Sequence, residues 1–127
     1  MHSYPHGEVV IVIDCEDLNR AANFWTEALG YRRDGEPSER YFSLLPTTGD
    51  GPELLLQKVP EQKAGKNRLH LDLRTRDLAR EVERTVDAGA VQLSNEPLLE
   101  GGWLWHVLAD PEGNEFCVLQ PPATYWT

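Results

Sequence analysis

The sequence has 127 residues, the length of a single domain, and 40% of them are hydrophobic, which is enough for one core. Twelve basic and twenty-one acidic side chains give a net charge of −9, which disfavours nucleic acid and anionic membrane as partners. The longest apolar run, Val9 to Ile13, is too short to cross a bilayer, and no signal-peptide pattern is visible. We therefore expect a cytoplasmic protein, in which Cys15 and Cys117 are reduced thiols rather than a disulfide.

The first half of the chain is expected over residues 8–59. It opens with a β-branched run, residues 8–14, that is typical of a buried strand. Asp17 can cap a helix that Gly30 ends. The apolar face of this helix would carry Leu18, Ala21, Ala22, Trp25, Ala28 and Leu29. Three further strands are expected over residues 31–33, 40–45 and 53–59.

The second half, residues 68–120, repeats this order. Residues 68–74 alternate with period two, and Asp77 begins a second capped helix that ends near Gly89. Its apolar stripe would be Leu78, Val82, Val86 and Ala88. Three strands follow over residues 90–93, 103–108 and 115–120. The sequence thus predicts an α+β fold of two βαβββ halves in one domain, 1–127, joined by a polar linker over residues 60–67.

Polar side chains on the strand of residues 68–74 are the first candidates for chemistry. His70 and Asp72 share a face because strand side chains alternate. Such a pair can act in acid–base catalysis or bind a metal, whereas a histidine that only hydrogen-bonds a neighbour is the plainer alternative.

Aromatic side chains suggest a second feature. Trp103 and Trp105 share one strand face and could form a wall against a flat ligand, fill a core, or meet another subunit. The tail from Pro121, with Tyr125 and Trp126, could close over a partner or over its own sheet.

The chain resembles the glyoxalase-like family of the vicinal oxygen chelate superfamily, which includes glyoxalase I, bleomycin-resistance proteins, fosfomycin-resistance enzymes and extradiol dioxygenases. The resemblance covers residues 8–121 and is carried by Asp110-Pro-Glu-Gly-Asn114, by Leu69-His-Leu-Asp-Leu73 and by the Asp17-Leu18 passage. It implies a mixed sheet curled into a cup, with the helices outside, and a homodimer. It leaves the reaction open, because such folds host many chemistries.

In metal-binding members of that superfamily, the first and last strands of each half supply the ligands. The resemblance places these positions at Val10, at His70, at Cys117 and near Leu55 or Gln57. Only His70 retains the expected ligand type, so we expect no cofactor. A divalent metal held by a rearranged site, with His70 as a ligand, is the alternative.

We therefore expect a protein that binds a small organic molecule, aromatic or apolar, in the cup without a complete metal site. The catalytic or anchoring residues would be His70, Glu115 and Asp72. The cup would be lined by Val10, Trp25, Tyr41, Gln57, Trp103, Trp105 and Cys117. The alternative is a lyase, isomerase or dioxygenase-type enzyme that uses His70 as acid–base group or metal ligand. A third version is an interaction module whose cup Trp103 and Trp105 fill.

Overall fold

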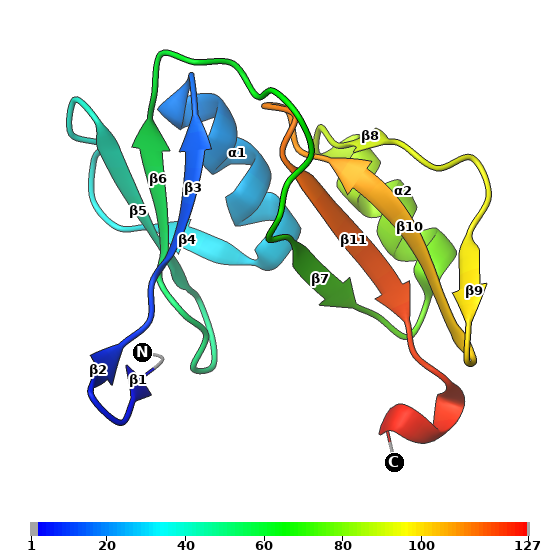
Figure 1. Ribbon diagram of the computed structural model, residues 1–127. Helices are drawn as coiled ribbons and strands as arrows, with labels where there is room; N and C mark the ends of the chain where they lie inside the picture. The colour runs from blue at the N-terminus through cyan, green and yellow to red at the C-terminus, as the bar shows by residue number, and fades with distance from the viewer. Residues whose placement is uncertain (1–2, 127) are drawn as a thin grey trace. The chain divides into compact units, whose positions relative to one another are not determined.

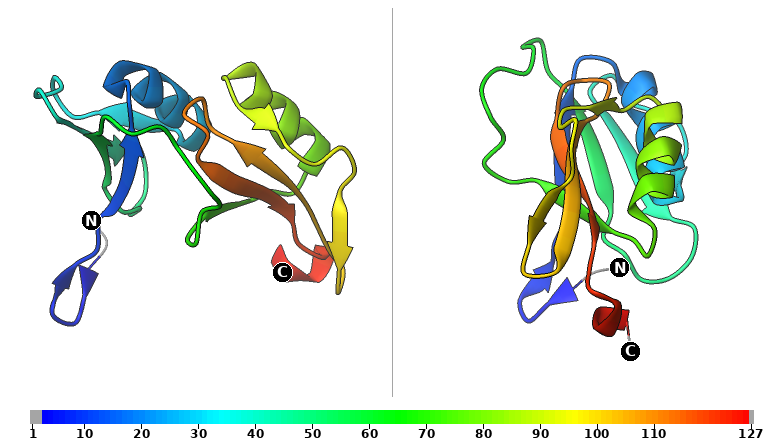
Figure 2. Two further views of the ribbon diagram at one scale, coloured as in Figure 1. Left: turned by 45° about the horizontal axis from the view of Figure 1, so that its top comes forward. Right: turned by 90° about the vertical axis from the view of Figure 1, so that its right-hand side faces the viewer.

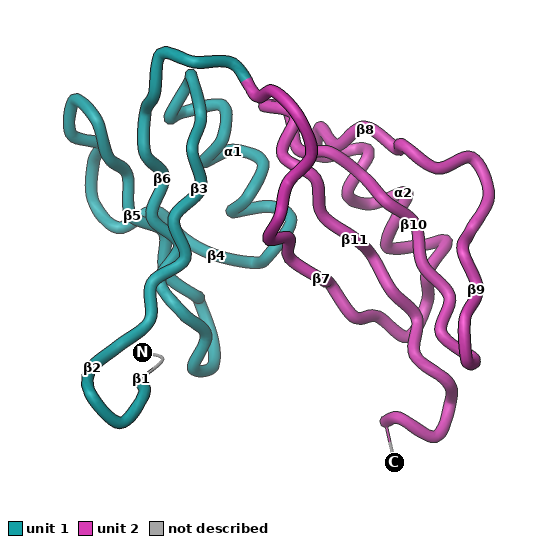
Figure 3. The backbone as a smooth tube through the Cα atoms, in the orientation of Figure 1, with its two compact units in different colours: residues 1–62 teal, residues 63–127 magenta. Residues whose placement is uncertain are grey.

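The computed structural model describes residues 3–126 of the chain. The backbone divides into two compact units, residues 1–62 and residues 63–127, shown in teal and magenta in Figure 3. The boundary falls inside the linker that the sequence predicts over residues 60–67. Each unit holds an α-helix and a mixed sheet, so the α+β class is confirmed (Figure 1).

Unit 1 is built around a four-stranded sheet with the order β3-β6-β5-β4. Its elements are β3 (Ile11–Cys15), α1 (Leu18–Leu29), β4 (Tyr31–Arg33), β5 (Tyr41–Pro46) and β6 (Leu54–Lys58). The parallel pair β3–β6 joins the first strand to the last, and the other neighbours are antiparallel. A small hairpin of β1 (Ser3–Tyr4) and β2 (Gly7–Glu8) precedes this sheet and takes Glu8 out of the expected first strand.

Unit 2 repeats this topology with the order β7-β11-β10-β8. Its elements are β7 (Leu71–Arg74), α2 (Leu78–Asp87), β8 (Val91–Gln92), β9 (Leu98–Glu100), β10 (Trp103–Ala109), β11 (Glu115–Gln120) and the 3₁₀ helix η1 (Ala123–Trp126). The first strand again runs parallel to the last. The internal repeat inferred from the sequence is therefore present in the fold, with β9 as an unpredicted extra strand beside β10.

Both helices begin at the predicted aspartates. The carboxylate of Asp17 accepts the backbone N–H of Arg20 at 3.0 Å, and that of Asp77 accepts the N–H of Arg80 at 3.1 Å. Each bond satisfies a donor that the first helical turn leaves free. Gly30 ends α1 in the left-handed conformation, with φ of 67°, as its lack of a Cβ allows.

Each helix packs on one face of its own sheet, as Figure 2 shows. In unit 1, every second side chain of the central strands is buried on the side of α1. These residues are Phe42 and Leu44 of β5, and Leu54 and Leu56 of β6. The prediction that the first strand is wholly buried is wrong, because only one sheet face lies under the helix. Val12, on the other face, is 49% exposed.

The buried stripe of α2 also differs from the prediction. It consists of Leu78, Val82 and Thr85, whereas Val86 is 39% exposed. Residues at i, i+4 and i+7 fall on one helix face, and this spacing selects Thr85 rather than Val86. The Thr85 hydroxyl donates to the carbonyl of Glu81 at 3.0 Å, which removes the cost of burying it.

The turn at Asp110-Pro-Glu-Gly-Asn114 sets the start of β11. Asp110 is buried, and its Oδ1 accepts the backbone N–H groups of Glu112 and Asn114 at 2.9 and 2.8 Å. Gly113 has φ of 89°, a value that side-chain-bearing residues rarely adopt. The motif therefore fixes where β10 ends and which side chains of β11 lie on each face of the sheet.

Both cysteines are free thiols, in agreement with the expectation from the sequence. No helix within residues 3–126 is long and apolar enough to span a membrane.

Candidate functional site

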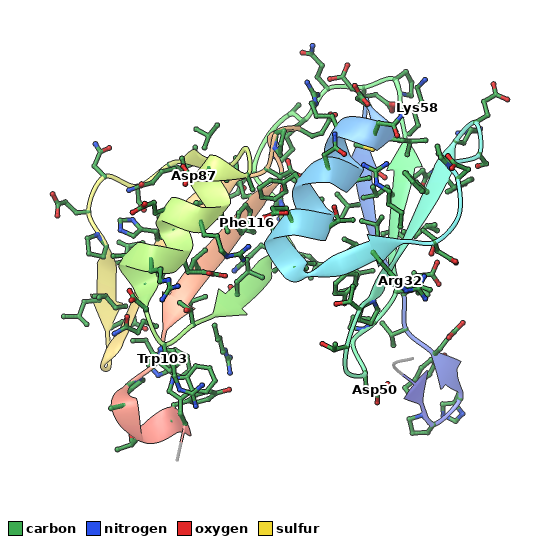
Figure 4. The ribbon with its side chains drawn as sticks, turned by 180° about the vertical axis from the view of Figure 1, so that it is seen from behind. Arg32, Asp50, Lys58, Asp87, Trp103 and Phe116 are labelled. Atoms are coloured by element: carbon green, nitrogen blue, oxygen red, sulfur yellow. The ribbon has the colours of Figure 1, made fainter. Side chains whose placement is uncertain are left out.

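The sheet of unit 2 has a helix face and a face without a helix, which we call the open face of unit 2. Phe116, Val118 and Leu108 are almost completely buried and lie on the α2 side; Figure 4 labels Phe116. Since side chains alternate, the intervening residues belong to the open face. Strand pairing places Asp72 beside Cys117, and Cys117 beside Val107. The predicted candidates His70, Asp72, Cys117, Glu115, Trp103 and Trp105 therefore share the open face of unit 2.

Three of these residues converge. The Nε2 atom of His70 lies 3.2 Å from Oδ1 of Asp72, as the sequence spacing predicts. Donor atoms of His70, Asp72 and Cys117 all lie within 4.8 Å of one another. The His70 side chain is 46% exposed, because this residue precedes β7 and no α-helix covers this face of the sheet. We call these three residues the His–Asp–Cys cluster.

Cys117 is the buried member of the cluster. Burial, and after it the negative charge of Asp72, raises the pKa of the Cys117 thiol above its usual value. The thiol is therefore protonated at neutral pH and is a poor nucleophile. Its sulfur can still become a metal ligand, because a bound cation displaces the proton.

Glu115 lies on the open face, but its carboxylate bonds to Asn67 rather than to the His–Asp–Cys cluster. Its Oε1 accepts the backbone N–H of Asn67 at 2.9 Å, and the side-chain amide of Asn67 donates to the Glu115 carbonyl at 3.0 Å. The Asn67 N–H, and after it the charges of Lys66, Lys63 and His70, holds the pKa of the Glu115 carboxyl below its usual value. Glu115 thus fastens the segment before β7 to β11, a role that the sequence pattern did not indicate.

The row of side chains next to the His–Asp–Cys cluster begins with Arg74, which pairs with Leu119, and continues with apolar residues. Strand pairing aligns Leu119 with Trp105, and Trp105 with Leu98, one pleat along from the Cys117 row. Trp103 is the first residue of β10 and lies near η1 in Figure 4. Its ring packs edge-on against Tyr125, with centroids 5.5 Å apart. The tail therefore closes over its own sheet, one of the two alternatives that the sequence left open.

The open face of unit 1 carries the remaining candidates. Tyr41 and Gln57 are direct partners in the β5–β6 pairing, and Val10 lies just before β3. Trp25, which the sequence placed among the residues lining the cup, is instead 1% exposed on α1. The Trp25 ring packs edge-on against Phe24. Both residues belong to the buried face of α1, so Trp25 lies in the core on the helix side of the sheet.

Register shows which positions correspond in the two units. Val12 pairs with Leu55 in unit 1, as Asp72 pairs with Cys117 in unit 2. The counterpart of Cys117 is therefore Leu55 rather than Gln57, a choice that the sequence left open. Val10, Val12 and Leu55 stand in unit 1 where His70, Asp72 and Cys117 stand in unit 2.

The residues of the His–Asp–Cys cluster fit a divalent transition metal in type. Imidazole nitrogen, carboxylate oxygen and thiolate sulfur all bind zinc-like ions, and a catalytic site of this kind uses three protein ligands. The three donor atoms are close enough that side-chain rotations could bring them onto one ion. They all come from one half of the chain, whereas the superfamily resemblance implies ligands from both.

Two arginines near the tail were missed at the sequence level. The guanidinium of Arg74 donates to the Tyr125 hydroxyl at 2.8 Å and lies over the Trp103 ring, 5.0 Å from its centroid. Arg76 lies over the ring of Trp126, 4.4 Å from its centroid. The available signal was the Arg-x-Arg spacing after the strand, together with the two aromatic residues of the tail.

Known structures share this fold. A glyoxalase/bleomycin resistance protein/dioxygenase family enzyme from Burkholderia phytofirmans is 17% identical, with a TM-score of 0.71 over 87% of this chain and 95% of that chain. The fosfomycin resistance protein FosX from Mesorhizobium loti is 15% identical, with a TM-score of 0.70 over 97% and 98%. FosX from Listeria monocytogenes is 14% identical, with a TM-score of 0.70 over 93% and 95%. At these identities the likeness concerns the fold alone.

A search among curated proteins finds no match. The family model described as a glyoxalase-like domain matches residues 10–119, most of the chain and both βαβββ halves. The order of elements, the two parallel strand pairs and the Asp110 turn agree with that match. The chain therefore belongs to the glyoxalase-like domain family.

Proposed function

We propose that this protein binds a small organic molecule on the open face of unit 2. The observation that carries the proposal is the adjacency of two rows on that face. One row holds Asp72 and Cys117, and the next holds Leu119 and Trp105. A ligand with a polar head and an apolar or aromatic body matches this arrangement, because polar groups orient a ligand and apolar walls supply most of its binding free energy.

In this proposal His70 is the polar anchor. Its imidazole is within reach of solvent, and Asp72 accepts a hydrogen bond from Nε2 when that nitrogen is protonated. The opposite nitrogen, Nδ1, then accepts a hydrogen bond from a ligand hydroxyl or amide. Asp72 thereby sets the tautomer of His70, as second residues of acid–base pairs commonly do. The role of Val10, Tyr41 and Gln57, which belong to unit 1, stays a prediction from the sequence.

The direct test is an affinity panel. Small aromatic hydroxy, amide and keto compounds would be titrated by calorimetry against the wild-type protein, His70→Ala and His6→Ala. His6 is a matched control because it is an exposed histidine of the N-terminal hairpin. We expect His70→Ala to weaken binding on the order of tenfold, the effect of one lost hydrogen bond to an ionisable group, and His6→Ala to bind normally. Equal affinity of all three proteins would contradict the anchoring role.

The second candidate is an enzyme of the lyase, isomerase or dioxygenase type. The closeness of the His–Asp–Cys donor atoms favours it. His70, Asp72 and Cys117 would hold a divalent metal, which when bound would act as a Lewis acid toward a substrate oxygen. Without a metal, the exposed side chain of His70 would instead move a proton to or from a substrate.

Cobalt(II) tests this second candidate without a substrate. Thiolate coordination would give a charge-transfer absorption, which Cys117→Ser should abolish. Cys15→Ser is the matched control, because Cys15 is the other buried free cysteine and lies in unit 1. His70→Ala should weaken cobalt binding at least tenfold. An absorption that Cys117→Ser leaves intact would exclude this site.

We also propose that the protein is a homodimer. The supporting observation is the exposed apolar edge of unit 2, where Leu99 of β9 is 71% exposed and Leu98 is 45% exposed. An exposed apolar strand edge is a common pairing surface. Light scattering would measure the mass directly. A monomer at all concentrations would contradict the proposal.

A further inference from the structure

A pocket of about 310 Å³ lies beside the tail of unit 2, apart from the His–Asp–Cys cluster in sequence and lining. It is lined by Arg76, Gln120, Pro121, Ala123 and Trp126. Its volume is that of a small-molecule site. One cation, one amide and three apolar side chains make up this lining, so the pocket combines a charge with an apolar wall.

The arginine of this pocket has no ion-pair partner among residues 3–126. The protein has a net charge of −9, yet neither Arg76 nor Arg74 forms an ion pair with a carboxylate among residues 3–126. The nearby Asp77 carboxylate accepts the backbone N–H of Arg80 at the start of α2 and forms no ion pair with Arg74 or Arg76. In an acidic protein, two neighbouring arginines without carboxylate partners are a local anion-attracting feature.

Aromatic rings hold the two guanidinium groups in place. Arg76 lies over Trp126, and Arg74 lies 5.4 Å from the Tyr125 centroid while donating to its hydroxyl. Tyr125 and Trp126 also pack edge-on, with centroids 4.8 Å apart. A guanidinium held over a ring face keeps N–H edges that can donate in parallel to a carboxylate or phosphate.

Gln120 provides a further donor. Its Oε1 accepts the backbone N–H of Leu78 at 2.8 Å, which fixes the orientation of the amide. Within the described part of the chain, the amide nitrogen of Gln120 has no hydrogen-bond acceptor. The pocket therefore offers N–H donors from Arg76 and Gln120 next to the apolar surfaces of Pro121 and Ala123.

We propose that this pocket binds a small organic oxyanion. Its carboxylate or phosphate oxygens accept hydrogen bonds from Arg76 and Gln120, and its apolar body lies against Pro121, Ala123 and the edge of Trp126. The inference is independent of the proposed function, because no residue of the His–Asp–Cys cluster lines the pocket.

The test is an NMR titration of the ¹⁵N-labelled full chain with benzoate, phenyl phosphate, acetate and inorganic phosphate, with chloride at matched ionic strength. The side-chain N–H signals of Arg76 and Trp126 report on the pocket. We expect saturable shifts with benzoate or phenyl phosphate, and weaker binding of acetate and inorganic phosphate, which lack the apolar body. Saturation by benzoate assigns a carboxylate ligand, and saturation by phenyl phosphate assigns a phosphate ligand.

Arg76→Ala should weaken this binding on the order of tenfold or more, since it removes charge-assisted hydrogen bonds. Arg80→Ala is the matched control, because it removes an exposed arginine four positions further along the chain. Gln120→Leu should weaken binding less than Arg76→Ala. Shifts that never saturate, shifts that chloride reproduces, or an equal loss in Arg80→Ala would overturn the proposal.

Discussion

The two halves of this protein have the same topology but different open faces. In each unit the first strand runs parallel to the last, and an Asp-capped helix covers one face of the sheet. At equivalent positions unit 1 carries Val10, Val12 and Leu55, and unit 2 carries the His–Asp–Cys cluster. The helix-side faces preserve the fold, whereas the open faces have diverged. Of these equivalent positions, only those of unit 2 carry side chains that can bind a metal or transfer a proton.

Tryptophan substitutions should give the largest change in the free energy of unfolding. They compare a residue on the helix side of one sheet with a residue on the open face of the other. Trp25→Ala removes a ring that is 1% exposed in the core of unit 1, and we expect a loss of about 3–5 kcal/mol in the free energy of unfolding. Trp105→Ala, on the open face of unit 2, should cost less than half as much, because its ring is only half-buried. Urea unfolding measures both. Equal losses would show that Trp105 is a core residue rather than part of a binding face.

Substituting the equivalent glutamates of the two units, Glu115 and Glu53, should change stability less than the tryptophan substitutions do. Glu115 accepts the backbone N–H of Asn67, whereas its counterpart in unit 1, Glu53, accepts the hydroxyl of Ser43 at 2.7 Å. Glu115→Ala should reduce the free energy of unfolding by about 1 kcal/mol, the size of one hydrogen bond to a charged group after allowance for partial exposure. Hydrogen exchange of the Asn67 amide would accelerate in this variant and not in Glu53→Ala. An unchanged Asn67 exchange rate would contradict the fastening role.

The Glu115 contribution should also depend on pH. Because the folded-state pKa of this carboxyl is lowered, its stabilisation is present above the unfolded pKa and is lost as the pH falls through the folded pKa. The difference in stability between wild type and Glu115→Gln should therefore shrink in acid. Thermal unfolding between neutral pH and pH 3 measures it. A difference that stays constant in acid would assign the effect to packing.

The smallest expected effect concerns the thiol of Cys117. Asp72→Asn removes the charge that contributes to the raised pKa of Cys117, so the thiolate should form at a lower pH than in the wild type. Asp14→Asn, on the open face of unit 1, is the control. Thiolate absorbance during alkaline titration measures the change. All variants would also carry Cys15→Ser, so that Cys117 is the thiol that titrates. An unchanged pKa of Cys117 in Asp72→Asn would show that the Asp72 charge does not act on this thiol.

Much of the fold was predictable, because it rests on local signals. Asp17, Asp77 and Gly30 act at the helix ends as their chemistry indicates, and the Asp110 turn positions the last strand. Predictions failed where burial depends on tertiary packing. Thr85 replaces Val86 in the core, and Trp25 of α1 is buried in the core on the helix side of the sheet instead of on the open face. Strand β9 was missed because Pro97 and its neighbours resemble a loop.

The candidate site was partly predictable as well. The His70–Asp72 contact follows from strand alternation alone. The approach of Cys117 depends on the β7–β11 register, which no local pattern encodes. The hydrogen bond from Asn67 to Glu115, and the contacts of Arg74 with Tyr125 and of Arg76 with Trp126, join segments about fifty residues apart. Periodicity and capping signals are local in the sequence, so they do not predict such long-range contacts.

Backbone NMR during ligand titration tests the central claim most directly, since it compares the two open faces in one sample. With the best compound of the affinity panel, we predict saturable amide shifts at residues 70–72 and 117–119, and smaller shifts at their counterparts, residues 10–12 and 55–57. Saturable shifts that are largest in the unit 1 segments, or absent from both sets, would contradict the proposal that the ligand binds on the open face of unit 2.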